Sequence, residues 1–158
     1  MKIEYKFDPF ELAGIDPGEL SKSKVDDVLE TVSNYVLESV LSDVGGRRSP
    51  VTGDTFKALS PAYKTIKKKK GGTPVPNLEL DGDMLNALKI KKSSGGISLY
   101  IPSGKQALKA DNHNKFSPES KNTSVPARKF IPNENENESF RPAIIKGIKS
   151  IIEDALDD

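Results

Sequence analysis

Two stripes of apolar side chains at helical spacing, one near each end, restrict the folds open to these 158 residues. The first stripe predicts an amphipathic helix about five turns long. Its members are Val25, Val28, Leu29, Val32, Val36 and Val40. The helix is expected to begin at Asp16, a capping residue followed by proline, or within residues 23–26. Gly45 and Gly46 are expected to end it, because glycine readily takes the left-handed conformation common at a helix C-terminus.

The second stripe lies in residues 139–158 and predicts a C-terminal helix. Its apolar residues are Phe140, Ile144, Ile145, Ile148, Ile151, Ile152 and Leu156. Pro142 is compatible with a helix there because it falls in the first turn, where no backbone hydrogen bond is lost. Each of the two helices therefore needs a partner to cover its apolar face.

Segments with the two-residue period of a strand supply that cover. Residues 1–7 alternate between apolar and polar side chains, as do residues 88–92 and 97–101. The last two flank Ser93–Gly96, whose adjacent glycines favour a hairpin turn. Residues 126–132, bounded by prolines, are a short further candidate and are expected at a sheet edge. The sequence predicts an α+β fold: a small antiparallel β-sheet packed against a long N-terminal helix and a C-terminal helix, with extended loops.

The chain is long enough for one domain, and we expect residues 1–158 to form it. Residues 1–15 would be an N-terminal strand and arm. Residues 67–77 join four lysines to two glycines and two prolines, and residues 117–126 are polar and bounded by proline. Both segments are predicted to be flexible loops.

Composition excludes several classes of protein. Cysteine is absent, which excludes disulfides and thiolate chemistry, and the start of the chain lacks the features of a secretory signal. No apolar run approaches the roughly 18 residues that a membrane span requires. We therefore expect a small soluble domain that folds in the cytoplasm and has no membrane partner.

Charge is segregated along the chain, although the formal net charge is only +1. Residues 16–43 carry two positive and seven negative side chains, and residues 130–158 carry three and seven. The middle is basic: residues 47–72 carry eight positive side chains and one negative, and residues 89–129 carry nine and two. Complementary potentials favour oriented association, so copies of the chain could pair basic face to acidic face. The same basic middle could contact nucleic acid.

The single histidine, His113, lies between two asparagines and two positions after Asp111. With one histidine and no cysteine, a zinc site built from histidines or thiolates cannot be assembled within one chain. Asp111 and His113 would lie on different faces of a helix, or on one face of a strand. No sequence motif of a nucleotide-binding loop, metalloprotease or serine hydrolase is present. We predict no catalytic residue, no metal and no cofactor, and a structural or interfacial role for His113.

Two further patterns have structural interpretations. Asp81 and Asp83 flank a glycine, which favours a turn in which Asp83 caps a short helix over residues 84–88. The run Lys67, Lys68, Lys69 and Lys70 could neutralise phosphates. Because no aromatic residues interleave with it to stack on bases, specific nucleic-acid binding is not favoured.

Four segments, in order, resemble a known family. Residues 45–72 contain GRRSP, LSPAY and a lysine-rich end; residues 77–88 read NLELDGDMLNAL; residues 107–116 read ALKADNHNKF; residues 125–132 read VPARKFIP. Together with a closing helix, this series is similar to the virion-morphogenesis proteins of bacteriophages, the tail-completion or head–tail joining family. One departure is Arg48, where many members have an aromatic residue. Residues 1–44 share only the helix.

The resemblance implies a structural protein of the virion with no catalytic activity, assembled in the host bacterial cytoplasm. Such a protein would form a homo-oligomeric ring at the neck or at the head-proximal end of the tail. Its other partners would be the head connector or adaptor and the tail tube or tail terminator proteins, with non-specific contact to passing DNA. Residues expected at assembly contacts are Arg47, Arg48, Lys67, Lys68, Lys69, Lys70, His113, Arg128 and Phe130. In this interpretation His113 fixes the loop before the PARKF segment, with local backbone bonds from Asn112 and Asn114.

Two alternatives stay open beside this one. A small DNA-contacting packaging or binding module would show salt-dependent DNA binding at micromolar protein. An enzyme using Asp111 and His113 would lose activity, but not its fold, when His113 is replaced by alanine.

Overall fold

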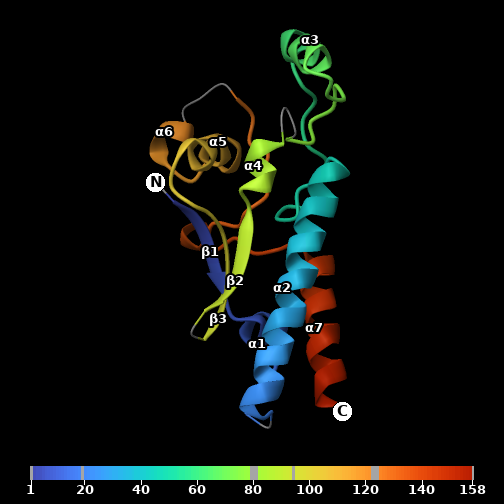
Figure 1. Cartoon of the computed structure of the whole chain (residues 1–158), viewed down its shortest axis with the longest axis vertical. Coiled ribbons are helices and arrows are strands. Elements are labelled where there is room, and N and C mark those ends of the chain that lie inside the picture. The colour runs from blue at the N-terminus through green and yellow to red at the C-terminus, as the bar shows by residue number, and fades with distance from the viewer. Residues whose placement is uncertain (1, 19, 79–81, 94, 122–124, 158) are drawn as a thin grey trace.

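The computed structural model describes residues 2–18, 20–78, 82–93, 95–121 and 125–157. In chain order the elements are β1 (Ile3–Phe7), α1 (Pro9–Ala13), α2 (Lys22–Gly45), α3 (Pro61–Lys69), α4 (Asp83–Asn86), β2 (Lys89–Ser93), β3 (Gly96–Ile101), α5 (Lys105–Asn114), α6 (Pro118–Lys121), the 3-10 turn η1 (Glu134–Glu136) and α7 (Pro142–Leu156). Figure 1 shows the long α2 beside α7, the sheet against this pair, and α3 at one end of the molecule.

The sheet is antiparallel with the order β1-β3-β2, so β3 is central. Leu99 of β3 lies opposite Tyr5 of β1 on one side and Ile90 of β2 on the other. Helix α2 contacts β2, β3 and α7, and α7 also contacts α1. The predicted α+β architecture, with its hairpin and its N-terminal strand, is confirmed.

The apolar stripe of α2 packs into the core as predicted. Val32, Val36 and Val40 have no exposed surface, and Ile144, Ile148 and Ile152 of α7 are at most 1% exposed. Leu156, the last residue of α7, is an exception to the predicted stripe, because it is 40% exposed.

The ends of α2 differ in detail from expectation. The helix begins after Ser21, whose Oγ accepts a hydrogen bond from the Lys24 amide. Asp16 instead closes a tight turn by accepting from the Gly18 amide. At the other end Gly46 has a φ of −82°, and the left-handed residue is Arg47, with a φ of 65°. The Arg48 amide bonds to the Asp43 carbonyl across this residue, so the helix closes one position later than the glycines suggested.

Residues 126–132 are not a strand, and this prediction was wrong. Pro126 and Pro132 lack backbone donors, and the amides of Phe130 and Ile131 both donate to the side-chain oxygen of Asn114 rather than to a neighbouring strand. The third strand of the sheet is β1, from the N-terminus.

The two expected loops contain helical residues. Lys67, Lys68 and Lys69 form the end of α3, which shortens the first loop, and α6 lies within residues 117–126, of which 122–124 are outside the described residues. Asp83 is the first residue of α4 rather than its cap; Gly82 occupies the cap position with a φ of 81°, so the expected turn forms at the glycine. Asp81 is outside the described residues. Within the described ranges, no helix is long and apolar enough to cross a membrane.

Candidate functional site

Helix α5 presents two different faces, and they separate Asp111 from His113. Ala107, Ala110, Asp111 and Asn114 are buried. Lys109, Asn112 and His113, at helical spacing, line a cavity on another side. The carboxylate of Asp111 accepts hydrogen bonds from the amide and the hydroxyl of Ser117, at 2.8 and 2.5 Å. Asp111 therefore organises the chain that follows α5, and the structure does not bring it together with His113.

Asn114 holds the PARKF segment against α5. Its side-chain nitrogen donates to the Ala110 carbonyl at 2.8 Å, and its oxygen accepts from the amides of Phe130 and Ile131 at 2.7 and 2.9 Å. His113 contributes its backbone carbonyl, which accepts from the Arg128 amide at 2.8 Å. The expected local bond is therefore found for Asn114, but its main bonds are to a distant segment. Asn112 is exposed at the cavity.

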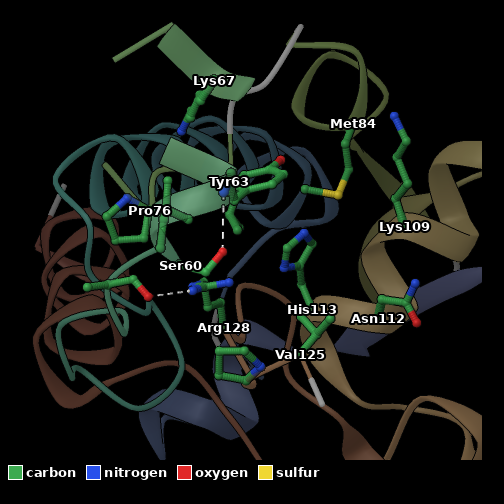
Figure 2. A pocket seen from close by; sticks show the side chains of 14 residues that line it. Ser60, Tyr63, Lys67, Pro76, Met84, Lys109, Asn112, His113, Val125 and Arg128 are labelled. Atoms are coloured by element: carbon green, nitrogen blue, oxygen red, sulfur yellow. Dashed lines mark hydrogen bonds between the residues drawn. The ribbon is translucent and has the colours of Figure 1, made fainter. Parts of the chain in front are cut away.

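The cavity has a volume of about 640 Å³ and lies between α3, α4, α5 and the segment that contains Arg128. Figure 2 shows the His113 imidazole pointing into it between Met84, Tyr63 and Arg128. Its apolar wall includes Leu59, Leu78, Met84, Val125 and Pro126, and its cationic residues are Lys67, Lys109 and Arg128. No carboxylate is among the described residues that line it. A cavity of this size with few charged groups suits a ligand that has both an apolar and an anionic part.

Two of the cationic side chains, Arg128 and Lys67, are buried, and each donates hydrogen bonds to a neighbouring segment of the chain. Arg128 is 6% exposed, and its guanidinium donates from Nε and Nη2 to the Lys57 carbonyl, at 3.1 and 3.0 Å, and from Nη2 to that of Ala58 at 3.2 Å. Burial lowers the pKa of Arg128. The ammonium of Lys67, on a side chain 1% exposed, donates to the Val75 carbonyl and the Asn77 side-chain oxygen, both at 2.5 Å. The first lysine of the run thus points inward, while Lys68, Lys69 and Lys70 are exposed.

His113 sits in an environment that disfavours its charged form. Its Nδ1 atom is buried and has no hydrogen-bond partner among the described residues. Burial first, and then the positive charges of Arg128 and Lys115, lower its pKa from 6.5 to about 4. The imidazole is therefore neutral at pH 7 and offers an unused polar atom beside the cavity.

The stability of the protein should fall as the pH drops from 6.5 to 4. In this window the unfolded chain binds a proton at His113 that the folded chain does not, so the free energy of unfolding decreases, by about 3 kcal/mol in all. Urea unfolding at pH 7 and pH 4 should show a loss that is smaller by this amount in His113→Asn. Equal losses in the two proteins would show that His113 titrates normally in the folded state.

The residues that the sequence analysis expected at assembly contacts do not form one surface in the structure. Arg47 and Arg48 are exposed just after α2, whereas Phe130 is fully buried in the core. Lys67, His113 and Arg128 come together at the cavity. Sequence reasoning missed Lys109, although its position four residues before His113 was a signal that both share one helix face.

Within the described residues, no group of three or more histidine or acidic side chains is placed to hold a metal ion. Comparisons with protein-family models, curated proteins and solved structures find no match to the chain.

Proposed function

We propose that this protein is a structural component of a tailed bacteriophage virion. It forms a ring at the neck or at the head-proximal end of the tail and joins the head connector to the tail. The cavity has no catalytic role in this proposal; it serves assembly.

The observation that carries this proposal is the convergence of three family-like segments on one another. Asn114, from ALKADNHNKF, binds the amides of Phe130 and Ile131 in VPARKFIP. Arg128 of that segment binds the carbonyls of Lys57 and Ala58, and the Ser49 hydroxyl donates to the Lys129 carbonyl at 2.6 Å. Segments that resemble the family in order along the chain therefore form one hydrogen-bonded unit. A common structural role for these segments requires such a unit.

Electron microscopy of virions labelled with antibody against this chain tests the proposal. The label should lie at the junction of head and tail, and a nonsense mutation in the coding sequence should give separate filled heads and tails. Label elsewhere on the particle, or intact virions from the mutant, would contradict it.

The exposed lysines at the end of α3 support a second candidate, a DNA-contacting packaging or binding module. Lys68, Lys69 and Lys70 are exposed, and basic residues cluster in the middle of the sequence. Affinity for duplex DNA at micromolar protein that falls linearly with the logarithm of salt concentration would favour this module over the neck protein.

A further inference from the structure

The last turn of α7 carries charges of the sign that destabilises a helix end. Glu153, Asp154 and Asp157 lie there, and no basic residue does. The helix dipole places partial negative charge at this end and favours cations. Leu156, between these acids, is 40% exposed. In the isolated chain, this turn therefore has two unfavourable features. Its negative charges lie at the negative end of the helix dipole, and the Leu156 side chain is exposed to water.

The cavity beside α3 has the complementary properties. It combines an apolar wall with Lys109 and Arg128, and its described lining contains no carboxylate. Tyr63 and Val125, which also line it, are 38% and 40% exposed, so large apolar side chains lie at its mouth beside the exposed polar residues Ser60 and Asn112. Exposed apolar side chains around a cavity favour an occupant large enough to cover them, such as a protein segment.

These two features cannot meet within one copy. Helix α3 lies at one end of the long axis of the molecule, and the C-terminal end of α7 lies at the other (Figure 1). A second exposed leucine beside an acid, Leu41 near Glu38, is a weaker match because it lies within the long helix α2 and not in its last turn.

We propose that the last turn of α7, residues 153–157, docks in the α3 cavity of a second copy of this chain. Leu156 enters against the apolar wall, and the carboxylates of Asp154 and Asp157 face Lys109 and Arg128. The contact joins two different surfaces, so it repeats from copy to copy and closes into a ring where the rotation between copies allows. The contact itself does not depend on the proposed function. Only the place of the ring, at the neck of the virion, rests on it.

Two charge-reversed variants of the full chain test the contact. Lys109→Glu alters the cavity and leaves the turn intact; Asp154→Lys combined with Asp157→Lys alters the turn and leaves the cavity intact. Each variant alone should be a monomer by light scattering at concentrations where the wild type associates. An equimolar mixture should associate beyond a two-subunit species, with the two variants alternating. Two compatible pairs are present in it: the unaltered turn with the unaltered cavity, and the altered turn with the altered cavity, whose charges are both reversed. The triple variant should associate like the wild type.

His113 reports on the site directly, because it is the only histidine in the chain. In the turn variant labelled with ¹³C-histidine, the imidazole signal should shift when unlabelled Lys109→Glu is added, and its pKa should rise toward 6.5 because a carboxylate stabilises the imidazolium. Unlabelled turn variant is the matched control and should have no effect. The turn variant should also melt at a higher temperature than the wild-type monomer, which would show that it is folded.

A mixture that stays monomeric, or a signal that shifts equally with the control or with inorganic phosphate, would overturn the proposal. The outcome is separable from the proposed function. If the antibody labels the neck but the variants do not associate, the contact is refuted and the neck role is not. If the variants associate but the antibody labels another part of the virion, the neck role is refuted and the contact is not.

Discussion

Replacing Val32 with aspartate is expected to leave the protein unfolded or insoluble. Val32 has no exposed surface and lies in the middle of the α2 stripe that packs in the core. An unpaired carboxylate there costs several kcal/mol, a large part of the roughly 5 to 15 kcal/mol that stabilises a typical domain. Circular dichroism and urea unfolding would measure the loss.

The matched control is Asn34→Asp, which adds the same charge to an exposed position on the same helix. Its free energy of unfolding should stay within about 0.5 kcal/mol of the wild type. A soluble, folded Val32→Asp protein would mean that the stripe of α2 faces a partner rather than the core.

Asn114→Ala should destabilise the protein by about 3 to 5 kcal/mol. The side chain is fully buried and makes three hydrogen bonds, and its loss leaves the amides of Phe130 and Ile131 without an acceptor. Each unsatisfied buried group costs roughly 1 to 3 kcal/mol. Urea unfolding measures the total, and hydrogen exchange should speed up most at these two amides.

Asn112→Ala removes the same side chain from an exposed position two residues earlier on α5 and should change stability by less than about 0.5 kcal/mol. If the two variants unfold at the same urea concentration, the PARKF segment is held by its apolar residues and not by Asn114. That result would also weaken the view that the family-like segments form one unit.

The sequence alone determined the elements that have a clear period. The valines of α2 and the isoleucines of α7 repeat with the helical spacing, and the hairpin strands alternate around two glycines. These patterns predicted the α+β fold because burial of one face is decided locally, by the spacing of apolar side chains. Composition alone excluded zinc sites built from histidines or thiolates within one chain, because the sequence has one histidine and no cysteine.

Only the tertiary structure decided the partners of residues whose role depends on distant segments. Asn114 accepts bonds from residues 16 and 17 positions away, Arg128 reaches carbonyls about 70 positions away, and Lys67 is drawn inward from a run of otherwise exposed lysines. The proline-bounded segment at 126–132 matched the pattern of a strand, but two of its amides bond to the side chain of Asn114, and the sheet consists of β1, β3 and β2. No local period encodes such pairings, because each depends on where the folded chain brings a single donor and acceptor together.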